Sequence, residues 1–200
     1  PRSAELRRCG FAGDIVMVES DAGAPCDRPN LSKDYLAGNA QEEWIPLRGE
    51  EFYTQHNIDL IRNVRVDSID SASKTVTLSN GETKRFDKLL LATGAEPVRL
   101  SMPGGDLPHV HYLRTLADSN AIIEAASSAK KAVVIGASFI GLEVAASLRA
   151  RELEVDVVGL EKTPLERVLG PALGSFVRKL HESKGVRFHL ETSAASVDAN

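Results

Sequence analysis

KAVVIGASFIGLEVAASLRARELEVDVVGLEK, residues 131–162, is the stretch that decides the fold. An apolar, β-branched run at residues 132–135 leads into a loop from Gly136 to Gly141, and the loop opens a helix with an apolar face. A second apolar strand follows at residues 155–160 and ends on Glu161. This order predicts a βαβ unit, in which the backbone N–H groups at a helix N-terminus can hold the pyrophosphate of a dinucleotide.

The loop departs from the dinucleotide fingerprint G-x-G-x-x-G at one position, where Ser138 replaces the middle glycine. That glycine normally lets the backbone approach the pyrophosphate without a Cβ, so we expect weaker binding unless the serine hydroxyl turns toward the phosphate. Glu161 lies 20 residues after Gly141, where a carboxylate should meet ribose hydroxyls. An ordinary glycine-bearing turn is the alternative, but the complete unit favours a nicotinamide nucleotide site. Its predicted residues are Gly136, Ser138, Phe139, Ile140, Gly141 and Glu161.

The composition is typical of a folded α/β protein. Of 200 residues, 42% are hydrophobic and 26% charged, and the net charge of −4 gives no reason to expect nucleic acid or an anionic membrane as partner. No apolar run approaches the ~18 residues that span a bilayer. Two cysteines, Cys9 and Cys26, and no C-x-x-C pair favour a reducing, cytoplasmic setting without a dithiol site. No metal site is predicted.

The two ends of the chain resemble parts of domains. Residues 1–9 are typical of a helix end, and a strand at residues 13–18 is followed by the acids Glu19 and Asp21. This is the second half of a βαβ unit, so we expect the first strand and its glycine loop to be missing. A last strand is predicted at residues 186–190, after which the chain stops within a domain. We therefore expect truncation at both ends.

The middle of the chain predicts strands and one helix. Residues 65–69 and 75–78 alternate with period 2 and are followed by a turn at residues 79–82. The run KLLL, residues 88–91, is typical of a strand buried on both faces, as in a parallel sheet, and leads to Thr93 and Gly94. A helix is predicted at residues 116–127.

Four motifs together resemble one family. DRPNLSK (residues 27–33), ATGAEP (92–97), LRT (113–115) and GASFIGLE (136–143) occur in the order found in flavin-dependent reductases related to apoptosis-inducing factor and to the ferredoxin reductases of bacterial oxygenase systems. The resemblance spans nearly all 200 residues. VIGASFIGLEVAASLRA and LERVLGP are most similar to the branch in which the reductase follows a Rieske iron–sulfur domain.

This resemblance implies an α/β fold of two doubly wound, Rossmann-like domains, with the NAD domain inserted in the FAD domain. Residues 1–118 would be a partial FAD-binding domain without its first glycine loop, and residues 119–200 a partial NAD(P)-binding domain. The implied activity is an NAD(P)H-dependent flavoprotein reductase in which NADH reduces FAD and electrons pass to a ferredoxin or Rieske-type iron–sulfur protein. We expect this fragment alone to hold FAD poorly and to be inactive.

The resemblance also implies which residues contact the cofactors. The expected FAD contacts are Arg28, Lys33, Val66, Thr93, Gly94 and Arg114, with either Glu19 or Asp21 as the ribose acid. Arg167 matches a basic NAD contact, and Cys26 replaces the family's usual tyrosine. Lys33 and Glu143 are expected to form an ion pair at the flavin N5 edge, where they tune the flavin rather than act as acid or base. For Glu143 the alternative is a favourable partner of the helix dipole.

The residues also bear on the choice between NADH and NADPH and on the choice between possible functions. Glu161 favours NADH over NADPH because a carboxylate repels a 2′-phosphate, although Lys162 and Arg167 nearby weaken that preference. For the function, the alternative is a redox-linked binding or signalling module with weak catalysis, which Ser138 and Cys26 favour. A disulfide reductase is disfavoured because the chain has no redox-active cysteine pair.

Overall fold

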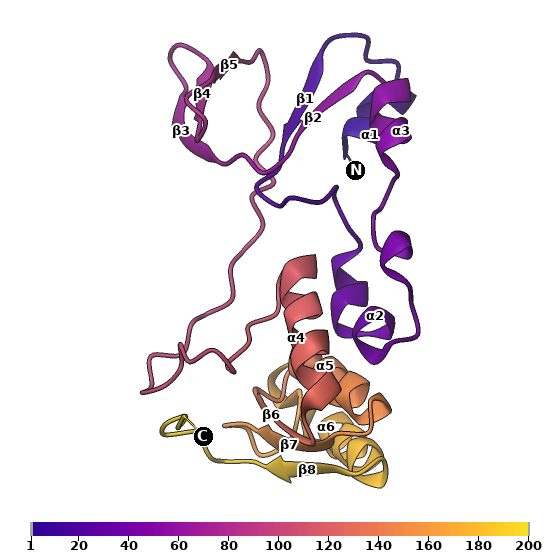
Figure 1. Ribbon diagram of the computed structural model, residues 1–200, viewed down its shortest axis with the longest axis vertical. Coiled ribbons are helices and arrows are strands. Elements are labelled where there is room, and N and C mark those ends of the chain that lie inside the picture. Colours follow the sequence, from indigo (N-terminus) through magenta and orange to yellow (C-terminus); the bar gives the residue numbers. More distant parts are fainter. Residues whose placement is uncertain (1, 200) are drawn as a thin grey trace. The chain divides into compact units, whose positions relative to one another are not determined.

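Two compact units form the computed structural model, which describes residues 2–199 (Figure 1). Unit 1 contains the residues up to Asp27 together with Glu43–Ala95, and unit 2 contains Arg28–Glu42 together with the residues from Glu96 onward. The segment Arg28–Glu42 is therefore separated in sequence from the rest of the unit in which it packs. Among the described residues, no helix has the length and apolar character needed to cross a bilayer.

Unit 1 begins with a helix and a small parallel sheet. Its first elements are α1 (Arg2–Arg8), β1 (Ile15–Val18), α3 (Glu50–Gln55) and β2 (Ile58–Ile61). Strands β1 and β2 run parallel, with Ile15 opposite Ile58, and both isoleucines pack with Tyr53 of α3 in a small core. The predicted helix and strand at the start of the chain are confirmed, within the usual uncertainty of element ends.

The rest of unit 1 is an antiparallel sheet of β3 (Val66–Asp70), β4 (Thr75–Leu78) and β5 (Thr83–Arg85). The first two strands and the turn after them are as predicted. The β3–β4 connection is closed by Asp70, whose carboxylate accepts hydrogen bonds from the backbone N–H groups of Ala72 (2.9 Å) and Ser73 (3.1 Å). This is the local capping of a turn that aspartate favours.

The predicted strand at residues 88–91 is wrong. These residues form no strand, and the side chains of Leu90 and Leu91 are 59% and 63% exposed rather than buried on both faces. An apolar run becomes a buried strand only where neighbouring strands satisfy its backbone groups and cover its side chains. Within the described residues, no strand pairs with this segment.

Unit 2 is a parallel α/β unit. Its elements are η1 (Arg28–Ser32), α2 (Asp34–Ala37), α4 (Leu116–Ser128), β6 (Lys131–Ile135), α5 (Phe139–Ala150), β7 (Glu154–Val158), α6 (Glu166–Ser183) and β8 (Val186–His189). The strands pair in the order β6-β7-β8, all parallel, and α5 packs against β6 and β7 while α6 packs against β8. The predicted Rossmann-like fold class is confirmed.

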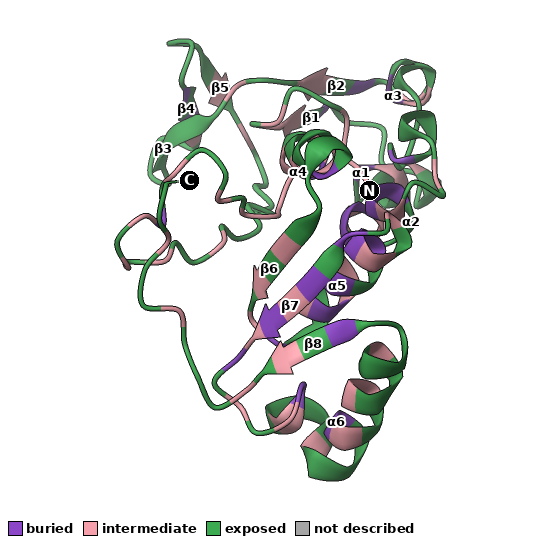
Figure 2. Ribbon diagram, turned by 60° about the horizontal axis from the view of Figure 1, so that its bottom comes forward, coloured by how far each residue is buried: buried purple, intermediate pink, exposed green. Residues whose placement is uncertain are grey.

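The core of unit 2 lies between α5 and the sheet. Val155 and Val157 of β7 are fully buried with Ala145 and Leu148 of α5, and Figure 2 shows these buried positions alternating along β7. Helix α4 matches its prediction and begins with a capping box, in which the Thr115 hydroxyl accepts from the Asp118 N–H. Helix α6 was not predicted.

The opposite face of β7 and β8 carries a charge cluster. Arg187 donates to both carboxylate oxygens of Asp156, from Nε at 2.9 Å and from Nη2 at 2.7 Å, and the His189 ring lies 2.8 Å from the same carboxylate. The hydrogen bonds from Arg187 hold the pKa of Asp156 well below its usual range. Because the pKa is lowered in the folded protein, the cluster stabilises the fold above about pH 4, and this contribution is lost as the pH falls.

We therefore predict that Asp156→Asn lowers the melting temperature at pH 7 by about 1–3 °C, since partly exposed ion pairs contribute little. The difference from the unmodified chain should shrink as the pH is lowered, because protonation removes the same charge. Thermal melts at several pH values measure both effects. Asp67→Asn, at an exposed position of β3, is the control. A deficit that stays constant from pH 7 to pH 2 would contradict the assignment.

Candidate functional site

The glycine loop connects β6 to α5 in unit 2. Gly136 directly follows β6 and has φ +116°, a backbone conformation that favours glycine. Gly141 lies in the first turn of α5, where a Cβ would come within 2.0 Å of the Gly136 carbonyl oxygen. Both fingerprint glycines are thus required by the backbone, the first for its φ and the second for the close packing of helix on loop.

The start of α5 can accept an anion. Ser138 is the N-cap residue, but its side chain makes no capping hydrogen bond, and the Leu142 N–H donates to the Ser138 carbonyl at 3.0 Å. The earlier N–H groups of the first turn, from Phe139 to Gly141, have no acceptor inside a helix. The loop backbone and this helix end therefore fit the pyrophosphate of a dinucleotide, and the Ser138 hydroxyl is available to turn toward it.

The predicted ribose acid lies beyond the next strand and is paired. Glu161 follows β7 by three residues, and its carboxylate is 3.5 Å from Nε of Arg167, the residue predicted as a basic NAD contact. The carboxylate and the guanidinium expected near the adenosine ribose are therefore neighbours. Lys162 directs its backbone N–H to Glu166 at 3.0 Å.

The predicted ion pair between Lys33 and Glu143 is present. Lys33 Nζ lies 3.2 Å from Oε1 of Glu143, and the Lys33 side chain is 50% exposed. Lys33 follows η1, whereas Glu143 lies in the second turn of α5, 110 positions further along the chain. The pair therefore joins two of the motifs through tertiary packing.

Ser32, which the sequence analysis did not predict as a site residue, also contacts the Glu143 carboxylate. The Ser32 hydroxyl donates to Oε2 of Glu143 at 2.6 Å, so neighbouring residues hold the two oxygens of one carboxylate. The only sequence signal was the position of Ser32 beside Lys33 in the DRPNLSK motif, since a buried serine is otherwise unremarkable.

Two predicted FAD-contact arginines also meet in unit 2. The guanidinium of Arg28 donates to the Arg114 carbonyl at 3.0 Å, and both side chains are half-buried. The Arg114 N–H in turn donates to Asp118 at 2.9 Å, which ties this residue to the start of α4. The structure thus brings the DRPNLSK and LRT motifs together.

The other predicted FAD contacts lie in unit 1. Glu19 directly follows β1, where its N–H donates to the Ile61 carbonyl at 2.8 Å and its carboxylate accepts from the Asp21 N–H at 3.3 Å. Val66 begins β3, and Thr93 and Gly94 lie in the exposed segment after β5, with φ +72° at Gly94. The residues expected around FAD are therefore divided between the two units.

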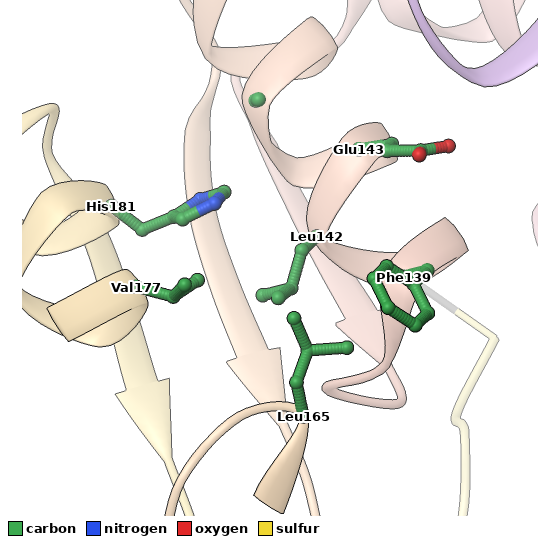
Figure 3. A pocket seen from close by; sticks show the side chains of 7 residues that line it. Phe139, Leu142, Glu143, Leu165, Val177 and His181 are labelled. Carbon is green, nitrogen blue, oxygen red and sulfur yellow. The ribbon is translucent and has the colours of Figure 1, made fainter. Parts of the chain in front are cut away.

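A small apolar pocket lies between α5 and α6, with a volume of about 220 Å³. Leu142, Leu165 and Val177 converge in it, while the carboxylate of Glu143 is directed away from His181 (Figure 3). Burial lowers the pKa of His181, which favours the neutral imidazole there. The pocket extends the candidate site from the glycine loop along one side of α5.

Known proteins are similar to this chain in sequence and fold. Residues 3–200 match the pyridine nucleotide-disulphide oxidoreductase family. Rhodocoxin reductase of Rhodococcus erythropolis is 37% identical over 98% of this chain and 46% of its own length, and apoptosis-inducing factor 3 of Mus musculus is 37% identical over 97% of this chain and 31% of its own length. The crystal structure of a ferredoxin reductase from Rhodopseudomonas palustris superposes with a TM-score of 0.94 at 37% identity, covering 99% of this chain and 49% of that one. The chain thus spans less than half the length of each of these proteins.

We predict that Gly141→Ala destabilises unit 2 by about 1–3 kcal/mol, because the added methyl group would strike backbone atoms that cannot move aside cheaply. This cost exceeds the gain of up to ~1 kcal/mol that alanine brings to a helix interior. Urea unfolding measures the change. Gly23→Ala is the control, since a Cβ there meets nothing within 4 Å. Equal stability of the two variants would show that the loop and helix do not pack as closely as described.

Proposed function

Since the chain belongs to the pyridine nucleotide-disulphide oxidoreductase family, we propose that the whole protein is an NADH-dependent flavoprotein reductase that passes electrons to an iron–sulfur protein. Residues 1–118 would contribute to its FAD-binding domain and residues 119–200 to its NAD-binding domain. The electron acceptor would be a ferredoxin or a Rieske-type domain. The two cysteines without a C-x-x-C pair support a cytoplasmic location.

The ion pair of Lys33 with Glu143 is the observation that carries this proposal. Lys33 belongs to the segment proposed to hold FAD, and Glu143 lies two residues beyond the loop proposed to hold NADH, yet their charged atoms are 3.2 Å apart. A reductase needs its two cofactors to meet, because hydride transfer depends mainly on the orientation of the reacting groups. A contact between the two cofactor segments is what such a protein requires.

The proposed roles combine the family resemblance with the positions of these residues in the structure. When bound, NADH supplies a hydride and FAD accepts it and can release electrons one at a time. The loop from Gly136 to Gly141 would hold the pyrophosphate of NADH, and Glu161 its ribose. Lys33, half exposed beside Glu143, would stabilise negative charge on the reduced flavin. Arg28 and Arg114 would bind the anionic part of FAD, with Glu19 at its ribose since Glu19 directly follows β1.

A redox-linked binding or signalling module is the second candidate. It is supported by the 37% identity to apoptosis-inducing factor 3 and by the departures at Ser138 and Cys26. Steady-state reduction of an artificial acceptor by the full-length protein separates the two, because a binding module should turn over very slowly.

In the full-length flavoprotein, we predict that Lys33→Met slows reduction of bound FAD by NADH by about 10–100-fold, since it removes a preorganised positive charge. Stopped-flow absorbance of the flavin band measures this rate. Lys179→Met, at an exposed position of α6, should leave it unchanged. Absence of stoichiometric FAD from the unmodified protein, or no reduction by NADH, would reject the proposed function.

Glu161→Ala should raise the preference for NADPH relative to NADH by about tenfold or more, because the carboxylate no longer repels the 2′-phosphate and Arg167 is released to bind it. The ratio of kcat/KM for the two nucleotides measures this effect. Adding Arg167→Ala to this variant should remove most of the gain in NADPH activity. If the unmodified protein already prefers NADPH, Glu161 has another role.

A further inference from the structure

Three polar residues on one face of α5 and its C-cap hold the segment Arg28–Glu42. Glu143, Ser147 and Arg151 are spaced by four residues, which places them one above another on a helix. The Ser147 hydroxyl lies 2.8 Å from the Ser32 carbonyl and 3.1 Å from the Lys33 carbonyl, and Arg151 donates to the Leu36 carbonyl. Glu143 is the member of this stripe that contacts side chains rather than backbone.

The Ser32 hydroxyl forms its stronger hydrogen bond with the Glu143 carboxylate. Ser32 is only 5% exposed, and its single hydroxyl hydrogen has two acceptors in reach, Glu143 Oε2 at 2.6 Å and the Pro29 carbonyl at 3.3 Å. The shorter contact, to a charged oxygen, is the stronger because charge-assisted O–H···O⁻ bonds have lengths near 2.6 Å. The hydroxyl thus restrains one carboxylate oxygen and leaves the other to Lys33.

This restraint limits how Lys33 can pair. A free carboxylate could rotate and engage the ammonium group with both oxygens. The hydrogen bond from Ser32 to Oε2 restrains that rotation and keeps Oε1 3.2 Å from Nζ, and the remaining N–H donors of the half-exposed ammonium group can face a ligand.

We propose that Ser32 is a positioning residue that acts through Glu143 to aim the Lys33 ammonium group at the flavin. This inference rests on the proposed function, because it requires that the ligand facing Lys33 is FAD. It predicts that loss of the hydroxyl alone, with the ion-pair residues intact, weakens the stabilisation of reduced flavin.

Three variants of the full-length flavoprotein test the proposal. Ser32→Ala removes the hydroxyl, and Ser32→Thr keeps it. Ser119→Ala is the matched control, because Ser119 is also fully buried and its hydroxyl donates to the Leu31 carbonyl at 2.9 Å, so it holds the same segment without touching Glu143.

The readouts are the midpoint potential of FAD, the rate of flavin reduction by NADH and the Kd of NADH. Ser32→Ala should lower the potential and slow reduction by about tenfold, the effect of losing one hydrogen bond to a charged group, with the Kd of NADH changed less than threefold. Ser32→Thr should restore most of the midpoint potential and of the reduction rate. Ser119→Ala should have the potential and the reduction rate of the unmodified protein.

A fourth readout needs no cofactor. In the apo protein, Lys33 should react faster with acetic anhydride in Ser32→Ala than in Ser119→Ala, as followed by mass spectrometry of the labelled peptide, because its partner is less restrained.

Equal potentials and rates for Ser32→Ala and the unmodified protein would overturn the proposal, and so would equal losses in Ser32→Ala and Ser119→Ala, which would indicate a purely structural role. If the unmodified protein binds no FAD or is not reduced by NADH, the proposed function itself fails, and this inference fails with it.

Discussion

Buried hydrogen bonds from α5 to the backbone of Arg28–Glu42 are the constraint on which the candidate site depends. The Ser147 hydroxyl donates to the Ser32 carbonyl of this segment, and the apolar side chains of Leu31 and Leu36 are almost completely buried beside it. A short segment without a regular partner strand must satisfy its buried carbonyl groups in this way, because unpaired polar groups in a protein interior are costly. Its attachment brings Lys33 to Glu143.

The carboxyl edge of the parallel sheet in unit 2 supplies the second half of the site. The loop after β6 and the loop after β7 meet there, since the Leu165 N–H donates to the Ala137 carbonyl at 3.1 Å. Leu165 has φ +58°, an uncommon conformation for a leucine, and its buried side chain forms part of the apolar pocket. Ligands of open α/β sheets bind at this edge because the strand ends and helix N-termini face the same space.

Local patterns accounted for much of the fold. The βαβ unit at residues 131–162 was predictable because its strands and helix each carry their own periodicity and are joined by a recognisable glycine loop. Helix α6 escaped prediction, and it contains Gly170 with φ +76° followed by Pro171, two residues that normally end a helix. At residues 88–91 a strand was predicted that is not present. An apolar run indicates burial, but it cannot show which other elements would cover its side chains.

The sequence by itself determined the α/β class, the glycine loop and the position of Glu161, because these depend on residue types at fixed short spacings, and the family resemblance implied the other charged residues expected at the cofactors. Only the tertiary structure decided that Arg28 reaches Arg114 and that Ser32 binds the carboxylate of the Lys33–Glu143 pair, a pair that the family resemblance had implied. These contacts join residues more than 80 positions apart, and no local pattern encodes which distant partner a buried polar group will find. The packing of Arg28–Glu42 on α4 and α5 makes that choice.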